Sequence, residues 1–112
     1  MRLAAGITLV AISALSCAES GLARPYNLTA DYVGGAVELR WECAPGPAGF
    51  LVQRSDGTDY NYRTLGWSEN GRKYYLDETV GYQQWYFYRV AAGYEPSKEM
   101  SDYCPEAAVY TE

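Results

Sequence analysis

Residues 36–42 read AVELRWE, a segment in which the apolar residues Val37, Leu39 and Trp41 alternate with three charged residues. Successive side chains of a β-strand point to opposite faces, so this pattern predicts a strand with one buried and one solvated face. Trp41 is the largest side chain of the apolar set. We therefore expect its ring at the centre of a hydrophobic core.

Similar short runs recur on both sides of this segment and are separated by residues that favour turns. The pairs Gly34-Gly35, Asp56-Gly57 and Asn70-Gly71 can adopt the positive φ of tight turns. This spacing of strands and turns is typical of an all-β sandwich, and no helix is needed to explain it. The predicted strands are 26–32, 36–42, 50–54, 61–65, 73–76, 85–92 and 105–111.

The strand predicted at 85–92 is aromatic on both of its faces, so hydrophobicity alone does not set its orientation. Arg89 does, because placing its guanidinium inward would bury a charge. Trp85 and Phe87 then share the outward face with Arg89. The expected core set is Tyr86, Tyr88, Val90 and Ala92.

The N-terminus has the pattern of an export signal, a positive start followed by an uncharged apolar run over residues 3–15. That run is shorter than the roughly 20 residues of a membrane-spanning helix. Two interpretations stay open: a signal peptide 1–18 in which Cys17 is discarded, or a lipoprotein leader ending at residue 16 that leaves Cys17 for lipidation. Both predict a secreted, periplasmic or cell-surface protein, and only the second attaches it to a membrane, through a lipid on Cys17.

The chain of 112 residues has room for one domain, which we predict at 25–112 after a flexible tether at 19–24. Of its three cysteines, only Cys43 and Cys104 fall in this domain. The sequence has no C-x-x-C spacing and no histidine, so it gives no indication of a metal site. In an oxidising compartment the two cysteines are expected to form a disulfide.

Five segments occur in an order and spacing that resemble a fibronectin type III domain, particularly the bacterial kind, over residues 25–111. The segments are Pro25-x-Asn27-Leu28-Thr29-Ala30, Val37-x-Leu39-x-Trp41, Phe50-Leu51-Val52-Gln53-Arg54, Tyr75-x-Asp77-x-x-Val80 and Tyr86-x-Tyr88-x-Val90-x-Ala92.

The resemblance implies a seven-stranded antiparallel immunoglobulin-like sandwich. Strands one, two and five would form one sheet, and strands four, three, six and seven the other. Tyr86 would match the family's corner tyrosine, whose hydroxyl bonds the backbone. Cys43 and Cys104 depart from the family pattern, and in this fold a bridge between them would join the two sheets at one pole.

Composition and charge exclude several functions. The formal charge is −5 and the nine basic residues are scattered, so we expect no nucleic-acid partner. Without histidine the usual catalytic triads and zinc sites are not available, and we expect neither enzymatic activity nor a cofactor or metal. Residues 55–59 are interpreted as a hairpin turn and not as a calcium loop. Four carboxylates are interpreted as solvated surface charges: Glu38, Glu42, Asp77 and Glu78.

The feature that most favours a function is the predicted outward face of the four-stranded sheet. Its exposed aromatic rings predict a contact surface, unless loops or the tether fold across them. The sequence thus predicts an extracytoplasmic, non-catalytic binding or spacer module that contacts an unknown protein. The alternative is a carbohydrate-associated module with Tyr and Trp platforms for glycan rings. The candidate binding residues are Leu51, Gln53, Tyr62, Trp85, Phe87 and Arg89.

Overall fold

The computed structural model describes residues 22–96 and 98–112, and in these ranges it contains seven β-strands and no helix. Each strand agrees with its predicted segment to within three residues at either end, so the all-β class is confirmed. The predicted leader and Cys17 lie outside the described residues. The strands are β1 (Tyr26–Val33), β2 (Ala36–Glu42), β3 (Gly49–Asp56), β4 (Arg63–Ser68), β5 (Tyr74–Asp77), β6 (Trp85–Gly93) and β7 (Ala107–Tyr110).

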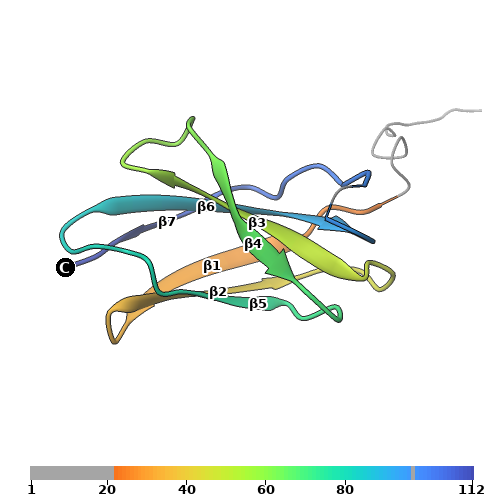
Figure 1. Cartoon of the computed structure of the whole chain (residues 1–112), viewed down its shortest axis with the longest axis horizontal. Coiled ribbons are helices and arrows are strands. Elements are labelled where there is room, and N and C mark those ends of the chain that lie inside the picture. Colours follow the sequence, from red (N-terminus) through yellow and green to blue (C-terminus); the bar gives the residue numbers. More distant parts are fainter. Residues whose placement is uncertain (1–21, 97) are drawn as a thin grey trace, which may run out of the picture.

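The strands form two antiparallel sheets that pack face to face (Figure 1). One sheet has the order β1-β2-β5 and the other the order β4-β3-β6-β7, as the family resemblance implies. The described chain enters at one end of the sandwich and the C-terminus lies at the opposite end (Figure 1). The long axis therefore separates the start of the described chain from the C-terminus.

The core lies between the sheets and is centred on the residues that alternation predicts. Trp41 is buried and meets Phe50 edge-on, with 5.3 Å between the ring centroids. This is a favoured geometry for aromatic pairs. From the other sheet, the predicted inward set of β6 is buried as well, which confirms its orientation. The buried cluster is Val37, Leu39, Trp41, Phe50, Val52, Tyr86, Tyr88, Val90, Ala92 and Cys104.

Tyr86 has the role expected of a corner tyrosine. Its ring is buried in the core, and its hydroxyl oxygen accepts a hydrogen bond of 2.7 Å from the backbone N–H of Gly81. The bond satisfies a polar atom that would otherwise be buried without a partner. It also ties the β5–β6 connection to the start of β6.

Two of the three predicted turns have the expected tight geometry. Gly34 and Gly35, with φ of 60° and 85°, join β1 to β2, and Asn70 and Gly71 adopt φ of 59° and 66°. The third differs, because β3 and β4 pair as a hairpin but are joined by the longer loop 57–62. Gly57 still adopts the expected positive φ, 78°, and the Ser55 hydroxyl of β3 accepts a hydrogen bond of 3.1 Å from the Asn61 N–H of the loop.

Asp77 is not a solvated surface charge, and its predicted exposure was wrong. It is 2% exposed, and its Oδ2 lies 2.9 Å from Nη1 of Arg54, which is 3% exposed. The same carboxylate accepts hydrogen bonds from the hydroxyls of Tyr88 at 2.7 Å and Thr79 at 2.6 Å. Since Arg54 belongs to β3 and Asp77 to β5, this buried ion pair links the two sheets across the core.

The end of the predicted tether packs against the domain. Leu22 is buried, and Arg24 forms an exposed ion pair of 3.4 Å with Asp102. Pairs this exposed contribute little stability, typically about 0–1 kcal/mol. The burial of Leu22 therefore does more than the ion pair to hold the incoming chain on the domain.

Candidate functional site

The outer face of the four-stranded sheet carries the predicted binding residues. Gln53 on β3 lies directly opposite Arg89 on β6 in the sheet register, and Leu51 lies opposite Ala91. Leu51, Gln53 and Arg89 are half-buried, and they point away from the core as alternation predicts. The structure thus brings the outward residues of β3 and β6 into one surface. This surface has two parts.

The first part is a clamp around Arg89. Its guanidinium lies between two aromatic rings, 4.2 Å from the ring centroid of Tyr62 and 4.0 Å from that of Tyr103. Its Nε donates a hydrogen bond of 2.9 Å to Oε1 of Gln53. The Tyr62 hydroxyl donates a hydrogen bond of 2.8 Å to Oε1 of Glu106. These contacts hold the Arg89 side chain in place and leave it half-buried.

The electrostatics of the clamp favour a neutral phenol at its edge. Burial raises the pKa of Tyr62, and the hydrogen bond to the Glu106 carboxylate raises it further. The hydroxyl of Tyr62 therefore keeps its proton and remains a donor to Glu106. Tyr62 and Tyr103 come from the loops that follow β3 and β6, so loop residues do cover this part of the face.

The second part is an exposed aromatic patch formed by Trp85, Phe87 and Tyr110. Trp85 is stacked on Phe87 with 6.3 Å between ring centroids and an interplanar angle of 25°. Its ring centroid lies 5.5 Å from that of Tyr110, which pairs with it across β6 and β7. Trp85 is 50% exposed and Tyr110 is 42% exposed. This patch is the part of the face that is open to a partner.

Sequence reasoning missed three residues of this face, Tyr103, Glu106 and Tyr110. Tyr110 had a usable signal, because it lies in a predicted strand with alternate residues to which no face was assigned. Glu106 had the same signal, because it lies in that predicted strand at a spacing of two from Ala108 and Tyr110. Tyr103 is in the irregular stretch before it, where no periodicity indicates which way a side chain points.

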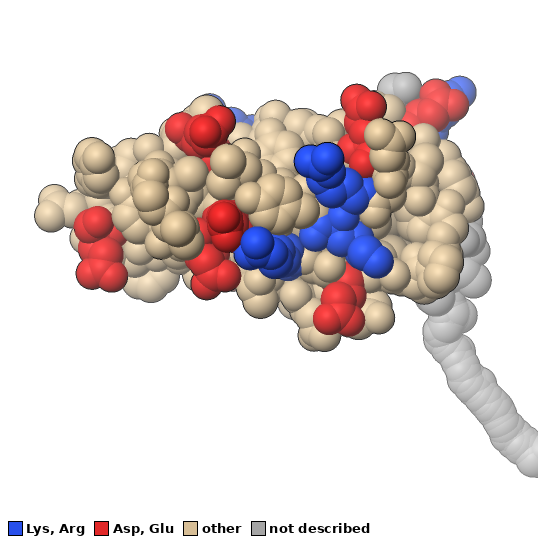
Figure 2. All heavy atoms as spheres, turned by 90° about the horizontal axis from the view of Figure 1, so that it is seen from below, with Lys and Arg blue, Asp and Glu red and all other residues tan. Residues whose placement is uncertain are grey.

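The outer face of the three-stranded sheet carries charges of both signs. Figure 2, which views the side of the three-stranded sheet, shows acidic residues spread over the face around a central group of basic ones. Arg40 and Glu38 on β2 form an ion pair of 3.0 Å there. That face has the mixed-sign character of an ordinary solvated surface.

The predicted disulfide is not formed in the structure, where Cys43 and Cys104 are both free thiols. Each sulfur contacts a different backbone group. Cys43 Sγ lies 3.8 Å from the carbonyl oxygen of Ala23, and Cys104 Sγ accepts a hydrogen bond of 3.4 Å from the N–H of Val90. Burial raises the pKa of both thiols, so the reactive thiolate is disfavoured at neutral pH.

Alkylation rates test this arrangement. Cys43 is half-buried and Cys104 is 4% exposed, so we expect iodoacetamide to modify Cys43 at least about tenfold faster in the folded protein. Mass spectrometry of timed samples measures both rates, and Cys43→Ser should leave only the slow reaction. A non-reduced mass two hydrogens too low would show that a disulfide forms after all.

Within residues 22–96 and 98–112, no three His, Cys, Asp or Glu side chains gather as a set that could hold a metal ion. In the same part of the chain, no helix has the length and hydrophobicity to cross a membrane.

Comparisons with solved structures agree with this fold. A Fn3-like protein from Clostridium thermocellum is 27% identical, with a TM-score of 0.67 over 81% of this chain and 95% of that chain. An FN3 domain of human collagen XX is 19% identical, with a TM-score of 0.62 over 78% and 88% of the two chains. A β-1,2-glucanase from Parabacteroides distasonis matches 82% of this chain over 13% of its own length, at 17% identity and a TM-score of 0.71. No family model and no curated protein matches the sequence.

Three features define an immunoglobulin-like β-sandwich: the strand order, the buried Trp41 on β2 and the corner tyrosine Tyr86 at the start of β6. Within that class, the fold is that of a fibronectin type III domain, as in the Fn3-like protein from Clostridium thermocellum. The family resemblance predicted from the sequence is thus confirmed.

Proposed function

We propose that this protein is an extracytoplasmic, non-catalytic module that binds a protein partner through the outer face of its four-stranded sheet. The observation that carries the proposal is the exposed patch of Trp85 and Tyr110 over Phe87, beside the clamped Arg89. Tryptophan, tyrosine and arginine are the residue types that dominate the binding energy of protein interfaces. Because Arg89 is already held in place, binding would not have to immobilise it.

The size and shape of the face favour a protein over a small molecule. Aromatic side chains bury about 150–250 Å² each, and monomers rarely leave apolar patches above a few hundred Å² exposed. A sheet face is also broad and shallow, whereas small ligands are usually held in concave sites. Residue 22, where the described chain begins, and the C-terminus lie at opposite ends of the sandwich (Figure 1), which supports an additional role as a spacer.

Photo-crosslinking in the native cell envelope tests the face directly. With a photoreactive amino acid at position 85, we expect a discrete adduct with one partner protein. The same group in place of Arg40, on the exposed side of the other sheet, should give none. Equal adducts from both positions would contradict the proposal.

The matched substitution is Trp85→Ala with Tyr110→Ala, which removes the two exposed rings. We expect partner affinity to fall at least tenfold, since hot-spot truncations cost about 2 kcal/mol or more. The melting temperature should change little, because both rings are about half exposed. A variant that melts normally and still binds its partner as tightly as the parent would move the site elsewhere.

A further inference from the structure

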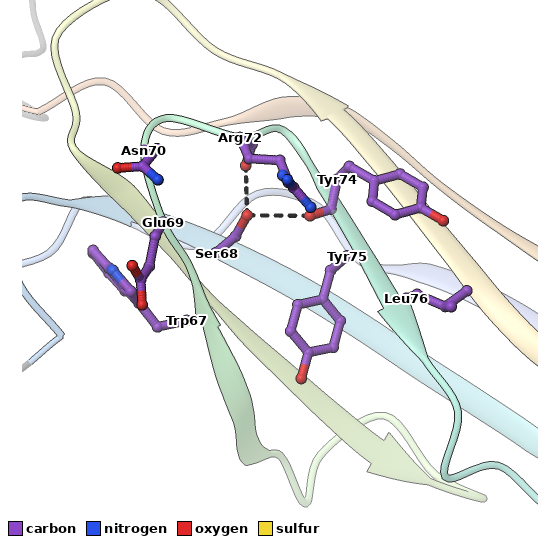
Figure 3. A pocket seen from close by; sticks show the side chains of 8 residues that line it. All are labelled: Trp67, Ser68, Glu69, Asn70, Arg72, Tyr74, Tyr75 and Leu76. Atoms are coloured by element: carbon purple, nitrogen blue, oxygen red, sulfur yellow. Dashed lines mark hydrogen bonds between the residues drawn. The ribbon is translucent and has the colours of Figure 1, made fainter.

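A groove of about 560 Å³ opens at one edge of the sandwich (Figure 3). The exposed patch on β6 and β7 is at the other edge of the four-stranded sheet. The groove lies where β4, the outermost strand of one sheet, faces β5, the outermost strand of the other. Its walls are residues 67–70, 72 and 74–76, none of which was predicted to belong to a site. The volume is within the range of about 300–1,000 Å³ typical of small-molecule sites.

One end of the groove is closed by the connection between the two strands. The hydroxyl of Ser68, a buried residue, hydrogen-bonds the carbonyl oxygens of Arg72 at 2.6 Å and Tyr74 at 3.1 Å (Figure 3). The Asn70-Gly71 turn completes the closure, with the Arg72 N–H donating to the Glu69 carbonyl at 3.0 Å. The end wall is therefore tied to both sheets.

Two aromatic rings at the groove pack on glycines, but from opposite sides of β4. Gly66 pairs with the buried Val52, so Tyr75 meets it from the inner side, whereas Trp67 pairs with Leu51 and lies on the outer side. A Cβ at Gly66 would lie 2.7 Å from the hydroxyl oxygen of Tyr75, so the Tyr75 side chain packs directly on the β4 backbone. A Cβ at Gly49 would lie 2.5 Å from the ring of Trp67. Burial, with the charge of Asp77, raises the pKa of Tyr75, so its hydroxyl stays protonated and able to donate.

Three polar side chains at the groove have no partner within residues 22–96 and 98–112. Among the described contacts, the side chains of Glu69, Asn70 and Arg72 form neither a hydrogen bond nor an ion pair. They provide one carboxylate, one amide and one guanidinium, which together carry no net charge. Each of these planar groups holds two donor or acceptor atoms side by side, which suits two neighbouring hydroxyl groups of a ligand.

We propose that this groove binds a neutral sugar of one to three rings. A sugar ring has apolar C–H faces, which pack on the electron-rich faces of aromatic rings, and a rim of hydroxyls for the polar groups. The balanced charge of the lining disfavours acidic sugars. An extended peptide could instead pair with a free strand edge, but β5 offers only four residues and the turn closes one end of the groove.

Chemical-shift titration of the ¹⁵N-labelled protein tests the proposal, with cellobiose and maltotriose as probes. We expect millimolar binding, with shifts over residues 68–76. Trigalacturonic acid, the acidic comparison, should bind more weakly. A hexapeptide of alternating valine and threonine, the extended-peptide comparison, should cause no shifts there.

Two substitutions localise the site without disturbing the fold. Asn70→Gly removes the amide and suits the positive φ of 59° at this position. Arg72→Gln removes the guanidinium. Each substitution should weaken sugar binding about threefold to tenfold, which is the loss of affinity expected for one hydrogen bond.

The outcomes separate this groove from the proposed protein-binding face. Trp85→Ala with Tyr110→Ala should leave sugar affinity unchanged, and Asn70→Gly should leave partner binding unchanged. The proposal is overturned if neither sugar causes shifts at the groove, if the acid or the peptide binds better, or if the shifts fall on the β6–β7 patch.

Discussion

Replacing Trp41 by alanine is expected to lower the free energy of unfolding by about 3–5 kcal/mol. The ring is 4% exposed and packs edge-on against Phe50, so alanine would leave a cavity between the two sheets. Small domains have a total stability of about 5–15 kcal/mol, so this loss would remove a large fraction of it. Urea denaturation followed by circular dichroism measures the change.

Trp41→Phe is the matched control, because it keeps an aromatic ring in the core. It also removes the indole Nε1, a buried donor for which the described residues provide no acceptor. We therefore expect a much smaller loss of stability than with alanine. Equal stability losses for phenylalanine and alanine would show that the aromatic packing contributes little.

Asp77→Ala should destabilise the domain by a similar amount, about 3–5 kcal/mol, because it leaves a buried charge without its partner. The Arg54 guanidinium would retain only Asp56, which is 41% exposed in its side chain, as an acidic neighbour at 2.7 Å. The Tyr88 hydroxyl would lose its acceptor too. Denaturant midpoints of the variant and the parent measure the effect.

A double-mutant cycle separates the ion pair from the other effects of the substitution. Arg54→Met combined with Asp77→Ala should cost clearly less than the sum of the two single changes, since neither charge is then left alone. Strict additivity would mean that the two side chains do not stabilise each other, despite the 2.9 Å between them.

The same carboxylate makes stability depend on pH. Burial alone would raise the pKa of Asp77, but hydrogen bonds from Thr79, Tyr88 and Arg54 outweigh it, so the pKa is lowered. The ionised form is thus favoured by folding, and its contribution is present above the ordinary aspartate pKa of about 3.9 and lost as the pH falls below it. We expect the parent to lose stability more steeply below about pH 4 than Asp77→Asn does.

The acid sensitivity can be read from urea midpoints measured between neutral pH and the acid range. Asp77→Asn is the informative control, because it has nearly the same shape and no titrating group. Parallel curves for the parent and the variant would assign the acid sensitivity to other carboxylates.

The strands, their order along the chain and their buried faces could be predicted from the sequence because these properties are local. A strand's side chains alternate with a period of two, so Val37, Leu39 and Trp41 had to share a face, and a single charge at Arg89 oriented all of β6. The glycine pair at 34–35 likewise required a tight turn. None of these inferences needs a contact between distant segments. The order of strands within the sheets does need such contacts, and it was predicted through the family resemblance.

The features that only the tertiary structure decided all join residues far apart in the chain. Asp77 looked like a surface carboxylate until the packing of the two sheets placed it against Arg54. Arg89 looked free to bind until two loops placed rings on both of its sides, because irregular segments have no period from which to infer direction. The groove between β4 and β5 exists only because the edges of two sheets face each other, and a linear pattern does not encode the space between them.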